Sequence, residues 1–339
     1  MRLFDTKPRG VPFATGADVP LTLRAQGSFF IGGRDIRSDA LSAVPAYAPS
    51  GTVVVDQVYV RFAVPAAVGG PPLVLVHGCC LSGQAWETTP DGRPGWDEMF
   101  LRAGFPVYAV DQAWRGRSGA GIAPAANGDG PLPTVFSAGR EDAWTVFRIG
   151  PRFPEPYPDT LFPVDAVGEL WKSMVPDFFY ALPTPNPTVP ALSALARRLG
   201  GAVLVSHSQA GLYPFQAAEA ARDGIAALVA LEPAALPDPA GDLSAFRDLP
   251  VLIVYGDHVA ASPRWAPRLA LARAFVAAAN AAGGRAELMS LPERGIRGNS
   301  HMLMQDRNSD VVAELVAAWI GRERPHGAGG AAGRPIGGA

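Results

Sequence analysis

The sequence predicts an α/β fold in which a mostly parallel sheet is covered by helices on both faces. Short apolar runs rich in β-branched residues recur along the chain, and several contain no polar residue, which is typical of strands buried on both sides. These runs alternate with helix-like segments, and 48% of the 339 residues are apolar, enough for a large core. Such folds bind their ligands at the carboxyl ends of the strands.

The predicted strands follow the apolar runs, and the predicted helices fill the intervals between them. Strands are expected at residues 28–31, 52–64, 73–76, 107–110, 202–205, 227–231 and 251–255. Helices are expected at residues 95–103, 191–199, 212–222, 265–282 and 309–321. The segment 265–282 stops at Gly283-Gly284, a common way for a helix to end.

The alternation is interrupted between residues 121 and 190. This stretch holds thirteen prolines and ten aromatic residues, and a disordered linker would lack the aromatics. We therefore expect a cap inserted over the active edge of the sheet, with a core formed by residues 1–120 and 191–321. The Gly- and Ala-rich tail, 322–339, is expected to be disordered.

Charge and cysteine content exclude several classes of function. With 29 basic against 31 acidic residues, the chain lacks the basic excess of a nucleic-acid binder. No run of about 18 apolar residues is present to span a membrane. The first residues contain no apolar run, so we expect a cytoplasmic protein if this is the full precursor, and a periplasmic or secreted one if a signal peptide was removed. The two adjacent cysteines cannot form a zinc site alone.

Ser208 is the candidate nucleophile. It follows the apolar run 202–205 in a turn of small residues and precedes a predicted helix, the setting of a nucleophile elbow. Ser206 and Ala210 stand where that motif usually has glycines, and Gly211 follows directly. The alternative interpretation is an ordinary serine that caps a helix.

A serine nucleophile needs a base, and His301 is the best of the five histidines. It lies between the predicted strands and the last predicted helix, which gives the order serine, acid, histidine expected of this architecture. His77 ends a strand, His207 adjoins the serine on the wrong side of the turn, His258 suits a loop, and His326 lies in the tail.

Two carboxylates are candidates for the acid that orients His301. Asp257 follows the strand run 251–255, and Glu232 follows the run 227–231. A carboxylate at a buried strand end needs a partner, so one of the two is expected to be structural.

The loop that begins at Gly78 is the candidate oxyanion hole. Its backbone amides, Cys79 above all, together with the amide of Gln209, can hold a developing oxyanion, with Gly78 and Cys80 as loop support. The plain interpretation of Cys79-Cys80 is two reduced, buried small residues, since a bond between neighbours forces their Cα atoms closer than most disulfides allow.

The chain resembles a family of bacterial carboxylesterases of the α/β-hydrolase superfamily that carry an adjacent-cysteine disulfide in the oxyanion loop. The matching segments are His77-Gly78-Cys79-Cys80-Leu81-Ser82-Gly83, Asp91-Gly92-Arg93-Pro94-Gly95-Trp96, Val107-Tyr108-Ala109-Val110-Asp111-Gln112, Arg115-Gly116-Arg117-Ser118-Gly119 and Ser206-His207-Ser208-Gln209. The resemblance implies an α/β-hydrolase fold, a Cys79–Cys80 disulfide, and Glu232 rather than Asp257 as the acid. It implies no metal or organic cofactor. Members are often exported, which suits a disulfide.

We therefore expect a serine hydrolase that cleaves a bulky apolar or aromatic carboxylic ester through an acyl-enzyme. Trp144, Phe178 and Phe179 are expected to line the substrate pocket. The alternatives are an acyltransferase or lactonase with the same residues, or a non-catalytic ligand receptor on the same scaffold. The expected partner is a small-molecule ester, with no nucleic acid and no membrane span; a homodimer is a further expectation.

Overall fold

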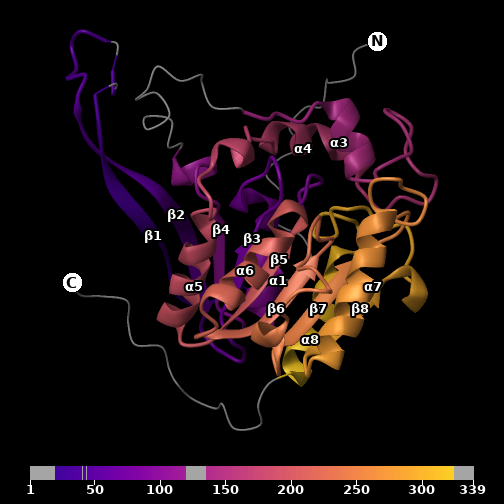
Figure 1. The fold of residues 1–339 in the computed structure, drawn as a ribbon. Helices are drawn as coiled ribbons and strands as arrows, with labels where there is room; N and C mark the ends of the chain where they lie inside the picture. Colours follow the sequence, from indigo (N-terminus) through magenta and orange to yellow (C-terminus); the bar gives the residue numbers. More distant parts are fainter. Residues whose placement is uncertain (1–19, 40, 43, 120–134, 324–339) are drawn as a thin grey trace.

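An eight-stranded sheet in the order β1-β2-β4-β3-β5-β6-β7-β8 forms the centre of the computed structural model, which describes residues 20–39, 41–42, 44–119 and 135–323 (Figure 1). β1 and β2 form an antiparallel hairpin, β2 pairs antiparallel with β4, and all other neighbours are parallel. The strands are β1 Leu23–Ser38, β2 Gly51–Pro65, β3 Leu73–Val76, β4 Val107–Asp111, β5 Ala202–His207, β6 Ile225–Leu231, β7 Pro250–Tyr255 and β8 Arg285–Ser290. The predicted α/β class and the mostly parallel sheet are confirmed.

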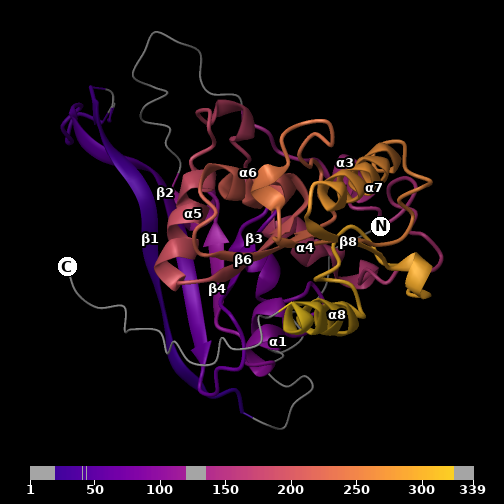
Figure 2. The same cartoon turned by 60° about the horizontal axis from the view of Figure 1, so that its bottom comes forward.

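Helices cover both faces of this sheet, with α5, α6 and α7 on one side and α1 and α8 on the other (Figure 2). The α-helices are α1 Trp96–Arg102, α3 Arg140–Val146, α4 Val167–Ser173, α5 Thr188–Leu199, α6 Tyr213–Ala220, α7 Ala266–Ala281 and α8 Ser309–Arg322. Single 3₁₀ turns occur at Gly83–Trp86, Gly116–Ser118, Val164–Ala166, Phe179–Ala181, Ser208–Leu212, Ser244–Phe246 and Pro292–Arg294. Each helix predicted from the sequence is present, with ends shifted by a few residues.

Two hydrophobic cores result, one on each face. Leu192, Phe215 and Phe275 fill the face under α5, α6 and α7. Phe100 and Trp319 from α1 and α8 pack on the other face. Because both faces are dry, the central strands are unbroken apolar runs, and every residue of β3 is buried.

The sheet is larger than the sequence predicted at both edges. β8 was not predicted, because its charged Arg285 and Glu287 break the apolar pattern of a buried strand. β1 is much longer than the predicted run 28–31. Most of its side chains face solvent, and Phe30 is 55% exposed, so the rest of the strand has no apolar run from which it could be predicted. The β1–β2 hairpin extends beyond the body of the molecule (Figure 1).

The part of 121–190 that the structure describes contacts loops that follow the carboxyl ends of the strands. Its backbone bonds to the loops there: Val175 N donates to Cys80 O, and His301 N donates to Phe147 O. α3 and α4 lie together at one end of the sheet (Figure 1). α5 begins at Thr188, earlier than the predicted boundary at 191.

Two further expectations concern the C-terminal tail and membrane-spanning helices. The tail predicted to be disordered lies outside the described residues from 324 onward, and α8 continues to Arg322. Among the residues described, no helix combines the length and apolar character needed to cross a membrane.

Candidate active site

Ser208 lies at a sharp turn between β5 and the helical segment that leads into α6. Its φ of 55° falls in the left-handed region, which a non-glycine residue adopts only when the surroundings enforce it. The turn needs small neighbours: a Cβ on Gly78 would lie 2.9 Å from the Ser208 Cβ, and one on Gly211 would lie 2.6 Å from the Pro233 Cβ. The sharp turn between a strand and a helical segment is the setting in which the sequence predicts a nucleophile elbow, and the role of Ser208 as the nucleophile stays a prediction.

His301 lies in the loop between β8 and α8, fully buried between aromatic rings. Its ring is parallel to that of Phe147 at 5.8 Å and packs against Trp265 at 4.2 Å. Nδ1 faces Glu232 Oε2 at 3.3 Å, and Nε2 has no hydrogen-bond partner among the described residues. One ring nitrogen is thus held by a carboxylate, and the other is left for a reacting group.

Glu232 follows β6 and is fully buried, also with a left-handed φ, of 51°. Its Oε1 accepts hydrogen bonds from Arg148 Nη2 at 2.6 Å and from Gly256 N at 2.5 Å. Its Oε2 is left for His301.

Asp257 points elsewhere. Its carboxylate accepts from the backbone amides of His258 at 2.8 Å and Gly298 at 3.1 Å. It has no contact with the His301 ring among the hydrogen bonds of the described chain. Of the two candidate acids, the structure brings Glu232 to the imidazole.

The loop that carries His301 is fixed by two further side chains. His207, which directly precedes Ser208, donates from Nε2 to the His301 carbonyl oxygen at 2.9 Å, and burial lowers the pKa of His207 to about 3. Asp306 accepts from the Ser300 amide at 2.9 Å and hydroxyl at 2.6 Å. Burial of this carboxyl raises the pKa of Asp306 to about 7.

The loop after β3, which is the candidate oxyanion loop, is held by a buried ion pair between Arg115 and Asp177. Arg115 also donates to Gly78 O at 3.2 Å and to Gln209 Oε1 at 2.7 Å. Asp177 accepts the Cys80 amide at 3.3 Å. The Cys79 amide has no acceptor within the described part of the chain, so it is among the loop amides that remain available.

Cys79 and Cys80 are both free thiols in the structure, and the disulfide that the resemblance implies stays a prediction. Their sulfur atoms and an Asp177 oxygen lie within 4.8 Å of one another, as do ligand atoms of Asp159, Asp257 and His258. Such spacing suits a metal ion, but Asp177 and Asp257 already have protein partners in Arg115 and in backbone amides.

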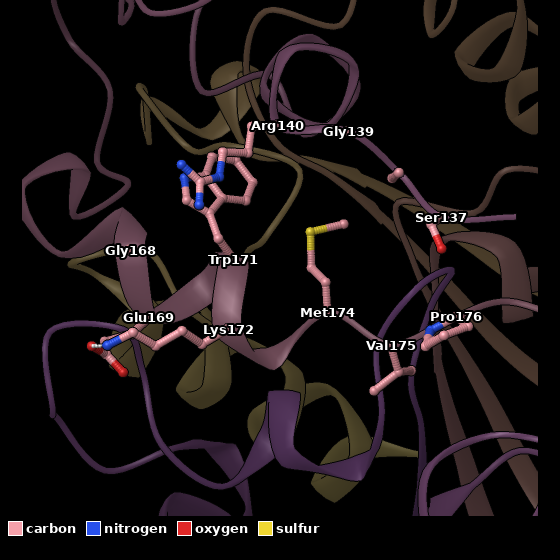
Figure 3. A pocket seen from close by; sticks show the side chains of 11 residues that line it. Ser137, Gly139, Arg140, Gly168, Glu169, Trp171, Lys172, Met174, Val175 and Pro176 are labelled. Atoms are coloured by element: carbon pink, nitrogen blue, oxygen red, sulfur yellow. Dashed lines mark hydrogen bonds and ion pairs between the residues drawn. The ribbon is translucent and has the colours of Figure 1, made fainter. Parts of the chain in front are cut away.

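A cavity of about 650 Å³ opens beside this loop, between the start of α3 and α4 (Figure 3). Trp171, Met174 and Val175 supply apolar surface, and Arg140 adds a positive charge. The cavity borders the oxyanion loop, because the Val175 amide donates to the Cys80 carbonyl at 2.9 Å.

The aromatic residues expected in the pocket do not line this cavity. Trp144 is buried in the core and donates to the Glu155 carbonyl, and Phe178 packs edge-on against Trp114. Phe179 is 39% exposed. Their part in substrate binding stays a prediction.

Sequence reasoning missed Arg148, Arg115 and Asp177 as parts of the site. A signal for Arg148 was present, since it is the one charged residue in the run Val146-Phe147-Arg148-Ile149. A charge inside an apolar run is buried, and a buried charge requires a partner. Nothing in the sequence indicated that the partner would be Glu232.

The chain is similar to two proteins of related description. A solved structure described as a novel bacterial esterase is 53% identical, with a TM-score of 0.88 over 91% of this chain and 99% of that chain. A protein named "Probable secreted lipase phiG", from Fungal sp. (strain ATCC 74256), is 29% identical over 327 residues, which cover 78% of this chain and 86% of its own. No protein-family profile matches the chain.

Proposed function

The chain belongs to the family of that bacterial esterase and is a hydrolase of the esterase and lipase type with the α/β-hydrolase fold; on this premise we propose that it is a serine carboxylesterase. Ser208 is the nucleophile, His301 the general base and acid, and Glu232 the acid that orients His301. The observation that carries the proposal is the contact of His301 Nδ1 with Glu232 Oε2 at 3.3 Å, which leaves Nε2 as the free basic nitrogen.

The reaction proceeds in two halves. Ser208 Oγ attacks the ester carbonyl while His301 Nε2 takes its proton, and the imidazolium then protonates the departing alcohol. Water attacks the resulting acyl-enzyme, gives its proton to His301 Nε2, and the acid is released as the proton returns to Ser208. Glu232 keeps the hydrogen of the neutral ring on Nδ1 and stabilises the charged ring.

The amides of Cys79 and Gln209 hold the oxyanion in both halves. The hydrogen bonds that Arg115 makes to Gly78 O, Gln209 and Asp177 support this role, because they connect the loop after β3 to the residue that follows the nucleophile. The Cys80 amide is occupied by Asp177 and acts as loop support.

The substrate is a bulky apolar or aromatic ester. A cavity of about 650 Å³ next to the oxyanion loop supports this class, because Trp171, Met174 and Val175 supply apolar surface for an acyl or alcohol group. Export of the enzyme, the second of the two expected locations, is supported by the name of the fungal relative, a secreted lipase.

The proposal is tested with the variant Ser208→Ala and a panel of esters with graded acyl and alcohol groups. Hydrolysis is expected to fall by about 10⁴-fold or more while the melting curve stays close to the parent, as is usual when a nucleophile is removed. Residual activity within tenfold of the parent overturns the serine mechanism. Product analysis with added alcohols identifies an acyltransferase, and a panel that includes cyclic esters identifies a lactonase. A folded protein that turns over none of them favours the receptor.

A further inference from the structure

Arg148 is a fully buried arginine that comes from the inserted segment rather than from the sheet. It follows α3, its side chain is 1% exposed, and its φ of 50° is left-handed. Ser208 and Glu232 share this backbone conformation. Strained backbone conformations of this kind cluster at functional sites, where the surrounding structure enforces them.

The guanidinium of Arg148 contacts the same carboxylate as His301. Nη2 donates to Glu232 Oε1 at 2.6 Å, Nε donates to the Asp257 carbonyl at 2.8 Å, and Nη1 lies 3.5 Å from His301 Nδ1. The carboxylate is therefore divided: one oxygen is held by Arg148 and a backbone amide, and the other faces the imidazole. The carbonyl of the preceding residue, Phe147, accepts the His301 amide, so two consecutive residues of the insertion hold the base and its acid.

A buried guanidinium is costly unless it is paired, and here its partner is the group that should stabilise a charged histidine. The Arg148–Glu232 pair is neutral as a unit. Because Arg148 already balances the charge of Glu232, the carboxylate stabilises a protonated His301 less, and Arg148 Nη1 places positive charge 3.5 Å from His301 Nδ1.

We propose that Arg148 is a positioning residue that holds the Glu232 carboxylate directed at His301, and whose charge keeps His301 neutral and ready to accept a proton in mildly acidic solution. The proposal rests on the serine mechanism above. Without Arg148, Glu232 would favour the charged ring. His301 would then become protonated, and lose its function as a base, at a higher pH.

Besides Arg148, groups of both charge signs lie around His301 and its loop. Glu232 approaches from β6, Arg268 from α7 and His207 from β5, and Asp306 lies behind the loop. Burial lowers the pKa of His301 well below its ordinary value, and the charges of Arg148 and then Arg268 lower it further.

The test is the pH dependence of kcat/KM, whose acidic limb reports the base of the free enzyme. In Arg148→Met and Arg148→Gln the positive charge is gone, so the limb should move to higher pH by about one pH unit or more. In Arg148→Gln the side-chain amide can still donate to Glu232, so this neutral variant is expected to fold even if Arg148→Met does not. Arg148→Lys keeps the charge, and its limb should stay within a few tenths of a pH unit of the parent.

Arg93→Met is the matched control, because Arg93 binds the carbonyls of residues 305–307 and supports the same loop without a contact to His301 or Glu232. Its limb should not move. A neutral Arg148 variant that loses activity while its acidic limb stays in place shows a merely structural role and overturns the proposal. An Arg148→Lys limb that moves as far as the limb of the neutral variants overturns it as well. Either result leaves the mechanism itself intact as long as Ser208→Ala is inactive.

Discussion

Glu232→Gln is expected to disable the enzyme, because of how the carboxylate is shared. Oε1 accepts from both Arg148 and the Gly256 amide, so an amide side chain must place its oxygen there. Its NH₂ group then faces His301 Nδ1, which must accept, and the ring hydrogen moves to Nε2. Nε2 can no longer take the proton of Ser208, and a comparable change in a serine protease lowers kcat by about 10⁴-fold.

The same substitution should also destabilise the fold. Arg148 keeps its charge but loses its carboxylate at a fully buried position. Removal of one partner from a buried ion pair costs about 3–5 kcal/mol of unfolding free energy. The measurement is hydrolysis of a chromogenic ester together with denaturant unfolding.

Asp257→Asn is the matched control. Its side chain is 14% exposed, accepts from the His258 amide at one oxygen and from the Gly298 amide at the other, and lies 3.9 Å from Arg297 Nη1; Asn keeps an acceptor oxygen for one of the two amides. A loss of about 1 kcal/mol in stability and less than tenfold in kcat is expected. A crippled Asp257→Asn beside a mild Glu232→Gln would refute the assignment of the acid.

Two further measurements address pH and redox state. Burial raises the pKa of Asp306 to about 7 against about 3.9 in an unfolded chain, so the native state binds more protons between these values, and this carboxyl contributes less stability as the pH rises. The unfolding free energy of the parent relative to Asp306→Asn should therefore fall by at least about 1 kcal/mol from pH 4 to pH 7; a difference that does not change with pH contradicts the raised pKa. The family resemblance predicts a Cys79–Cys80 disulfide, so the intact mass under denaturing, non-reducing conditions should show two hydrogens fewer than the dithiol. Mild reduction should lower turnover with little change in melting temperature, because so small a ring restrains little of the unfolded chain. Two alkylatable thiols in the active enzyme would contradict the bond.

The sequence predicted those features that leave a local pattern. Buried parallel strands are continuous apolar runs, so the central sheet was predictable. Small residues around Ser208 likewise predicted the sharp turn that the structure has there, whereas the role of Ser208 as the nucleophile stays a prediction. Edge strands lack a continuous apolar run. For this reason the sequence did not predict β8, and it predicted only a short part of β1.

Features that depend on contacts across the chain were not predictable in the same way. Glu232 and Asp257 both follow strands, and only the direction of each side chain separates them. Trp144, Phe178 and Phe179 are aromatic, but aromatic character alone does not predict which residues line a cavity, and Trp171 and Met174 meet there only through the fold of residues 135–190. Arg148 lies 84 residues from Glu232 along the chain, so no local spacing relates them.

The most direct test of the central claim is covalent labelling of the active enzyme with a fluorophosphonate, followed by peptide mapping. The probe reacts with a serine only when a neighbouring base activates it, so the predicted result is stoichiometric modification of Ser208, with activity lost in parallel and no labelling in Ser208→Ala. Active enzyme that resists the probe, or labelling at another residue that persists in Ser208→Ala, would contradict it.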